Sequence, residues 1–279
     1  MFSTDWQTSP RQYGVITERD VRIPVDDGIT LDCDLFRPDA PGKFPVLLAA
    51  HPYNKQAQSE PMVPEGVSYR RAFIESGDFN FYVRRGYVFV IMNIRGTGAS
   101  DGVFDHRNPD ARTIQDIYQA IEWLAAQDWC DGNVGMFGVS YFSVVQKRVA
   151  ALRPPHLKAI FALYGWTEGY RDLFYHGGIF AHGFFTSWTR NRGPGLKVEK
   201  NLKSDMGEVA YGTALEALRA DGELMSVPFL AEVIENPEDG LNPMVLEVLM
   251  HKLDDDWHQS RAVRFDGTEE IPAYFGADW

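Results

Sequence analysis

The sequence is poor in cysteine and in positive charge. Its 279 residues include only two cysteines, Cys33 and Cys130, too few for a disulfide framework, so both are expected to be free thiols in a reducing compartment. The formal net charge of −12 argues against a nucleic-acid or anionic-membrane partner. The chain opens without a basic and apolar leader, and no uncharged apolar run reaches the length of a membrane span. The expected location is therefore the cytoplasm, without a membrane partner.

The sequence also lacks the spacings that hold metal ions. It contains neither His-Glu-x-x-His nor paired Cys-x-x-Cys motifs, so no metal site is expected. The loop RGTGASDG (95–102) is rich in glycine, but its spacing is not Gly-x-Gly-x-x-Gly and no helix follows at once. We interpret it as a tight structural loop in which Arg95 and Asp101 could pair, rather than as a phosphate-binding loop. No cofactor is expected.

Several apolar runs predict the strands of one sheet. VRIPV (21–25) and ITLDCDLFRP (29–38) flank a DDG turn signal and predict an antiparallel hairpin. The second run alternates apolar and polar residues, as a strand with one solvated face does. The remaining runs are continuously apolar, as parallel strands buried on both faces are; they cover 44–52, 87–94, 134–139, 157–163 and 271–276.

Helical patterns lie between these runs. The segment 110–129 places four apolar side chains on one helical face: Ile114, Ile117, Ile121 and Leu124. A second helical pattern, 141–154, follows Ser140 and stops at a proline. An antiparallel start followed by alternating strands and helices predicts an α/β protein with a mostly parallel sheet and helices on both faces.

The composition of the sequence changes at about Trp166. Residues 166–193 are rich in aromatic residues and glycine, and residues 208–240 have an acidic, helical pattern. Strand character returns only in IPAYFGADW (271–279), so about a hundred residues are inserted before one last strand. The aromatic residues recur at helical spacing, which favours the core of a helical insert over a cofactor or lipid site.

Ser140 lies between a predicted strand, VGMFG, and a predicted helix, YFSVVQKRVAAL. A Gly-x-Ser at a strand–turn–helix crossing is the nucleophile-elbow pattern, in which a strained turn raises the serine hydroxyl above the sheet edge. Gly138 supplies one small neighbour, whereas the usual second glycine, two residues after the serine, is replaced by Phe142. The helix N-terminus favours developing negative charge, so Ser140 is predicted to be a nucleophile rather than a turn serine.

The motifs of the chain, taken in order, resemble the family of cocaine esterase, α-amino-acid ester hydrolase and Xaa-Pro dipeptidyl-peptidase. The resemblance rests on IPVDDGITLDCDLFRP, GKFPVLLAAHPYNK, RGYVFVIMNIRGTGASDG, DIYQAIEWLAAQDWCDGNVGMFGVSY and YRDLFYHGGIF. It implies an α/β-hydrolase fold with a core at 1–165, a helical cap inserted at 166–268, and the start of the returning core strand at 269–279. It also implies a small-molecule acyl ester or amide substrate, and does not identify which one.

Acyl transfer at a serine needs hydrogen-bond donors for the oxyanion. The backbone N–H of Tyr141, directly after the nucleophile, is one expected donor. The resemblance implies that the hydroxyl of Tyr53, in the loop HPYNK after the third strand, is the other. His51 in the same loop is interpreted as a packed or hydrogen-bonded histidine.

The sequence does not place the base that a serine nucleophile requires. On this fold the triad follows the order Ser, Asp, His. Asp278 lies near the position of the family's acid, but the family pattern Gly-Trp-x-Asp reads Ala-Asp-Trp here, and no histidine follows it. His258 stands beside three aspartates in LDDDWHQSR (253–261), which we interpret as a solvated cap segment rather than a relocated base.

Two hypotheses follow. In the first, the chain is the N-terminal part of a longer serine hydrolase whose remainder carries the histidine and a β-sandwich domain that the resemblance implies. In the second, the chain is complete and is a non-catalytic hydrolase-like binding protein, or one that a partner completes. The edge of the run 271–276 would favour self-association, which leaves a homo-oligomer open.

Overall fold

The computed structural model describes residues 7–58, 75–105, 109–190, 201–240, 242–265 and 270–277. The strands of the main sheet are β1 (Val15–Pro24), β2 (Thr30–Pro38), β3 (Phe44–His51), β4 (Val88–Asn93), β5 (Cys130–Val139), β6 (Leu157–Leu163) and β9 (Ala273–Gly276). The helices within this part of the chain are α1 (Lys55–Gln58), α2 (Phe79–Val83), α3 (Ala111–Ala125) and α4 (Tyr141–Ala151).

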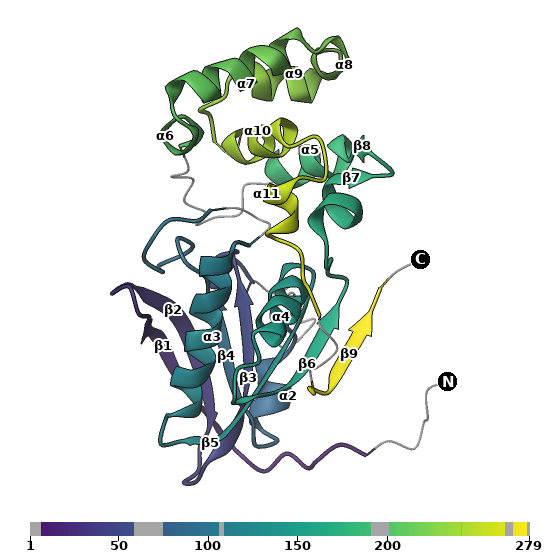
Figure 1. Ribbon diagram of the computed structural model, residues 1–279. Helices are drawn as coiled ribbons and strands as arrows, with labels where there is room; N and C mark the ends of the chain where they lie inside the picture. Colours follow the sequence, from purple (N-terminus) through teal and green to yellow (C-terminus); the bar gives the residue numbers. More distant parts are fainter. Residues whose placement is uncertain are drawn as a thin grey trace, which may run out of the picture.

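The seven strands form one sheet in the order β1-β2-β4-β3-β5-β6-β9. β1 pairs with β2, and β2 with β4, in antiparallel orientation, whereas β4, β3, β5, β6 and β9 are parallel. Both the predicted hairpin and the predicted sheet are therefore confirmed. β5 lies between β3 and β6, so the strand that leads into Ser140 is internal to the sheet (Figure 1).

The two faces of the sheet carry different helices. α3 and α4 pack on one face, where the four predicted apolar residues of α3 are buried against strand residues such as Leu48 and Val90. α2 covers part of the opposite face, next to Phe36, Phe89 and Phe137. Helices on both faces of a mostly parallel sheet confirm the predicted α/β-hydrolase architecture.

The expectation that β2 has a solvated face is wrong. Asp32 and Asp34 alternate with apolar residues but are 0% and 1% exposed. Their burial is possible because the ammonium group of Lys55 lies between them, 2.9 Å from Asp32 Oδ1 and 2.6 Å from Asp34 Oδ1. A buried charge needs such a partner, and nothing in the strand pattern announces one.

The loop after β4 is structural, as predicted, but its ion pair differs. Arg95 binds Asp116 of α3, with 2.7 Å between Nε and Oδ2, and also pairs with Asp27. The carboxylate of Asp101 instead accepts hydrogen bonds from the backbone N–H and the hydroxyl of Thr30. The loop is thereby tied to α3 and β2.

The described residues between 166 and 265 form mostly short helices beyond the carboxyl ends of the parallel strands (Figure 1). A π-helical turn (Tyr170–Phe174) and a two-stranded ribbon come first, followed by a series of α-helices. The ribbon strands and helices are β7 (Tyr175–His176), β8 (Ile179–Phe180), α5 (His182–Arg190), α6 (Leu202–Met206), α7 (Glu208–Ala220), α8 (Gly222–Met225), α9 (Pro228–Glu235), α10 (Asn242–Met250) and α11 (Asp256–Gln259). As expected, the aromatic residues pack together, with Phe174 and Phe185 stacked at 5.2 Å between ring centroids.

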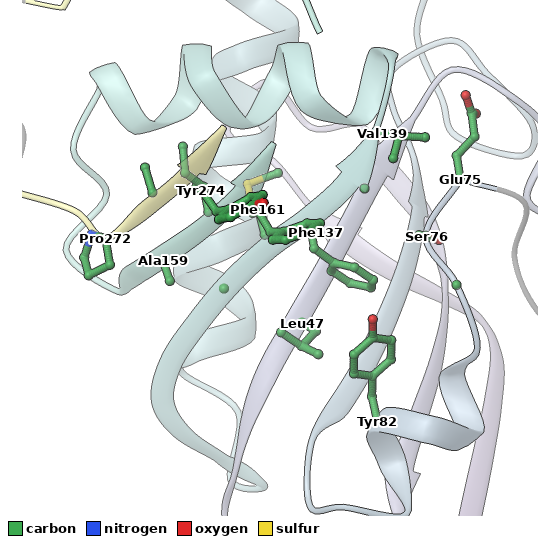
Figure 2. A pocket seen from close by; sticks show the side chains of 16 residues that line it. Leu47, Glu75, Ser76, Tyr82, Phe137, Val139, Ala159, Phe161, Pro272 and Tyr274 are labelled. Carbon is green, nitrogen blue, oxygen red and sulfur yellow. The ribbon is translucent and has the colours of Figure 1, made fainter. Parts of the chain in front are cut away.

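The sheet face opposite α3 and α4 carries a largely apolar hollow of about 750 Å³ over β3, β5, β6 and β9. Figure 2 shows the rings of Phe161 and Tyr274 lying side by side there, with Phe137 and Leu47 further along the floor. Phe161 and Tyr274 stack at 5.0 Å between ring centroids, and each is about half exposed, at 44% and 51%. On this face, this part of the sheet is therefore lined by apolar side chains, whereas its other face is covered by helices.

Candidate active site

Ser140 occupies the turn between β5 and α4. Its backbone has φ 59° and ψ −125°, a conformation that L-residues rarely adopt and that costs about 1–3 kcal/mol. The turn is held on both sides, because the Ser140 N–H donates to the carbonyl of Leu163 at 3.0 Å and the Val139 N–H to the carbonyl of Glu75 at 3.0 Å. These are the strand–turn–helix context and the strained serine that the sequence pattern predicts.

The turn is crowded, which explains the residues beside the serine. Gly138 has φ +127°, and a Cβ atom on it would lie 2.6 Å from Cβ of Phe142. The large side chain of Phe142 fits because it points down into the core, where its ring stacks on His51 at 4.8 Å between centroids. The departure from the usual second glycine therefore leaves the turn intact, with Gly138 as the residue that has to be small.

Tyr141 begins α4, directly after the serine. Its ring is completely buried among the residues that pack against α3 and α4, and its hydroxyl has no hydrogen-bond partner among the residues that the structure describes. Burial raises the pKa of this phenol well above its usual value, so the ring stays neutral. The group of Tyr141 that is available for chemistry is its backbone N–H at the start of the helix.

Tyr53 lies in the three-residue loop between β3 and α1. β3 and β5 are hydrogen-bonded neighbours in parallel register, so this loop and Ser140 share the carboxyl edge of the sheet. The ring of Tyr53 packs edge-on against that of Tyr141, with 6.4 Å between centroids. The structure thus brings the two predicted donor residues into contact, beside the turn that carries the serine.

None of the histidines in the described part of the chain is hydrogen-bonded to the hydroxyl of Ser140. These histidines therefore do not supply a base for Ser140. His51 is packed, as expected, and its burial lowers its pKa to about 3. His258 is not solvated, contrary to expectation: it is completely buried, with Nε2 2.8 Å from the carbonyl oxygen of His251 and aromatic rings around it. Asp278 lies outside the described residues.

Two residues near the site escaped the sequence analysis. Lys55 follows Tyr53 by two positions, and its ammonium group reaches the buried aspartates of β2. The signal available in the sequence was a lysine shortly after one apolar strand, together with two aspartates in another strand. Glu75 contacts the end of β5 through its carbonyl, and its carboxylate accepts a hydrogen bond from Gln58 at 3.1 Å. Burial raises the pKa of Glu75 to about 7, a shift that no local sequence pattern announces.

The described residues contain no group of three or more His, Cys, Asp or Glu side chains that could hold a metal ion. Within the same residues, no helix is both long and apolar enough to cross a membrane. The chemistry that the arrangement can support uses a strained serine hydroxyl at a sheet edge with a helix N-terminus and a tyrosine beside it.

Residues 27–264 match the family model of X-Pro dipeptidyl-peptidase (S15 family). The chain is similar to cocaine esterase from Rhodococcus sp. (strain MB1 Bresler), with 32% identity over 263 residues, which is 93% of this chain and 43% of that protein. It is also 24% identical over 235 residues to the Xaa-Pro dipeptidyl-peptidase of Lactobacillus delbrueckii subsp. lactis, covering 77% of this chain and 27% of the relative.

Solved structures agree with these relatives. A CocE/NonD family hydrolase from Staphylococcus aureus superposes with a TM-score of 0.63 at 29% identity, over 92% of this chain and 40% of that one. An α-amino acid ester hydrolase superposes with a TM-score of 0.65 at 20% identity, over 94% of this chain and 41% of that one, which supports the fold. The chain therefore spans less than half the length of these relatives.

The crowding at the turn makes Gly138→Ala destabilising. The new methyl group meets Phe142 and the backbone stays at positive φ, so we expect a loss of about 1–3 kcal/mol in the free energy of unfolding. Gly212→Ala is the matched control: Gly212 lies inside α7 with no atom within 4 Å of an added Cβ, and alanine should stabilise that helix by about 0.5–1 kcal/mol. Urea unfolding midpoints measure both, and similar shifts for the two variants would contradict the crowding argument.

The buried carboxyl of Glu75 gives stability a specific pH dependence. Its pKa is raised from 4.5 to about 7, so between these values the folded protein keeps a proton that the unfolded chain releases. The free energy of unfolding should therefore fall as pH rises through this window, by about 1–3 kcal/mol for this group. Glu75→Gln cannot titrate and should flatten that slope, whereas Glu223→Gln, on the exposed side of α8, should keep it. Unfolding curves from pH 4.5 to 7.5 test this; parallel slopes for parent and Glu75→Gln would refute it.

Proposed function

The chain belongs to the X-Pro dipeptidyl-peptidase (S15) family, and from that premise we propose that the protein is a serine hydrolase of acyl esters or amides that works through an acyl-enzyme on Ser140. The observation that carries the proposal is the strained backbone of Ser140 at the carboxyl end of an internal strand, directly before the N-terminus of α4. A serine in that position presents its hydroxyl to a substrate above the sheet edge.

The roles of the neighbouring residues follow from the reaction. When the Ser140 oxygen attacks the substrate carbonyl, negative charge develops on the carbonyl oxygen. We assign its stabilisation to the backbone N–H of Tyr141 and the hydroxyl of Tyr53, supported by the contact between these two residues beside the turn. The base that removes the Ser140 proton, and the carboxylate that orients it, then come from outside the described residues.

Residues 166–268 are proposed to act as a cap over this edge, between the core at 1–165 and the returning strand at 269–279. Support comes from the helices that lie beyond the carboxyl ends of the strands and from the pairing of β9 with β6 (Figure 1). The substrate would be a small acyl ester or amide bound between cap and sheet edge.

We also propose a cytoplasmic location, supported by the two buried free thiols of Cys33 and Cys130. We further propose self-association along the edge of β9, where the side chains are half exposed.

Covalent labelling tests the nucleophile. In the whole protein, with whatever residues the natural chain carries beyond these 279, a fluorophosphonate probe should label Ser140 and leave Ser140→Ala unlabelled. Ser143→Ala is the matched control, since Ser143 is buried one turn along α4 and its loss should leave labelling intact. Labelling that persists in Ser140→Ala would remove Ser140 from the mechanism; no labelling of the parent would favour a non-catalytic binding protein.

A second variant tests the oxyanion donor. Tyr53→Phe should lower kcat by about 10²–10³-fold, the typical cost of one lost oxyanion donor, and should change KM little because the bond strengthens mainly in the transition state. Tyr87→Phe is the control, because Tyr87 precedes β4 at the opposite edge of the sheet. Turnover of p-nitrophenyl acetate measures both, and an unchanged kcat for Tyr53→Phe would place the donor elsewhere.

A further inference from the structure

Lys55 is an unusual residue for its place in the fold, because its side chain is 0% exposed. Its ammonium group lies 2.7 Å from Asp20 Oδ1, 2.9 Å from Asp32 Oδ1 and 2.6 Å from Asp34 Oδ1. An ammonium group has three hydrogens to donate, so these carboxylates use all of them and fix its orientation. We call Lys55 and these three aspartates the Lys55 anchor.

The charge on Lys55 is retained despite its burial. Burial lowers the pKa of Lys55, but the hydrogen bonds to Asp20, Asp34 and Asp32 outweigh this effect and leave the pKa above its usual value. Lys55 in turn lowers the pKa of Asp20, first through their hydrogen bond. Lys55 and Asp20 are therefore both charged at neutral pH, and Arg19 is a further partner of Asp34.

The anchor holds the loop that carries Tyr53. Lys55 is the first residue of α1, two positions after Tyr53, and its backbone N–H donates to Oδ1 of Asn93 at 3.1 Å. Asn93 also donates to Asp32, at 3.3 Å, so both the backbone and the side chain of Lys55 are bound to one network. At the other end of the loop, the carbonyl of His51 accepts a hydrogen bond from Ile94 at 3.0 Å. Only three residues separate these two clamps.

Stability alone does not account for this arrangement. Replacing a buried ion pair by apolar residues of similar volume is often neutral or stabilising, because desolvation of the charges is so costly. A charge cluster in which every ammonium hydrogen is donated holds a single geometry. An apolar side chain at position 55 could shift, whereas an ammonium group with three hydrogen bonds cannot. The residue whose geometry is set in this way is Tyr53, next to the turn of Ser140.

We propose that the Lys55 anchor positions the Tyr53 hydroxyl for the oxyanion, which makes Lys55 a positioning residue of the reaction. The proposal rests on the role given to Tyr53 above. Lys55 itself is enclosed by the aspartates and acts only through the loop.

A double-mutant cycle in the whole protein tests the coupling. Lys55→Met combined with Asp32→Asn and Asp34→Asn removes the buried charges together, so that no buried carboxylate is left without its cation. This variant should lower kcat for p-nitrophenyl acetate by about 10–100-fold, since a misplacement of about 1 Å can cost about 10²-fold, with little change in KM. In the Tyr53→Phe background the same substitutions should change kcat by less than about three-fold, because the hydroxyl they position is already gone.

The controls separate the possible failures. Lys252→Met removes an exposed lysine that pairs with Asp221, and should leave kcat unchanged. Equal losses from the anchor variant in both backgrounds, or no loss in either, would overturn the positioning role while leaving Tyr53 as donor. A silent Tyr53→Phe would instead remove the donor assignment and the anchor's role with it.

Circular dichroism and the urea midpoint establish that each variant is folded. If the anchor variant does not fold, Asp32→Asn alone replaces it, because asparagine keeps an acceptor oxygen beside the ammonium group and removes one charge. This variant should lower kcat in the parent by a smaller factor. In the Tyr53→Phe background it should change kcat by less than about two-fold. An equal loss in both backgrounds would again overturn the proposal.

Discussion

The positive φ of Ser140 is unfavourable for an L-amino acid, and the sheet around it holds it in place. The N–H groups of Val139 and Ser140 donate to the carbonyls of Glu75 and Leu163, so the turn cannot relax without breaking hydrogen bonds at the carboxyl edge of the sheet. Leu163 is fixed as the last residue of β6, which pairs with β5 and β9, whereas Glu75 lies in the turn before α2 and is hydrogen-bonded to Gln58. The strained turn is thus held by β6 on one side and by the segment before α2 on the other.

The two sides of the site are fixed by different physical means. On the side of Tyr141, the proposed donor is a backbone group of α4, and its position follows from the helix itself. On the side of Tyr53, the proposed donor is a side chain on a short loop, which ends at Lys55 and its buried aspartates. Water and salt have little access to those charges, so their hold on the loop should depend weakly on ionic strength.

The sheet could be predicted from the sequence because buried parallel strands are continuously apolar, as in 44–52 and 87–94. The start of β5 at Cys130 could not, because Asp131, Gly132 and Asn133 have the composition of a turn and lie in an irregularity of the strand, between the pairs Phe44–Cys130 and Val46–Val134. Within the site, Ser140 and Tyr53 stand in recognisable motifs. Lys55 and Glu75 act through burial and through partners distant in the sequence, which single-chain patterns do not encode.

The same backbone angle decides which hydroxyl can serve at position 140. Positive φ is tolerated with difficulty by any side chain and is a true outlier for a β-branched one, whose second γ substituent crowds the backbone. Threonine offers the same hydroxyl group as serine, yet this turn excludes it on steric grounds, whereas cysteine, unbranched at Cβ, is sterically admissible. The geometry of the main chain therefore disfavours threonine at this position, whatever the reactivity of its hydroxyl.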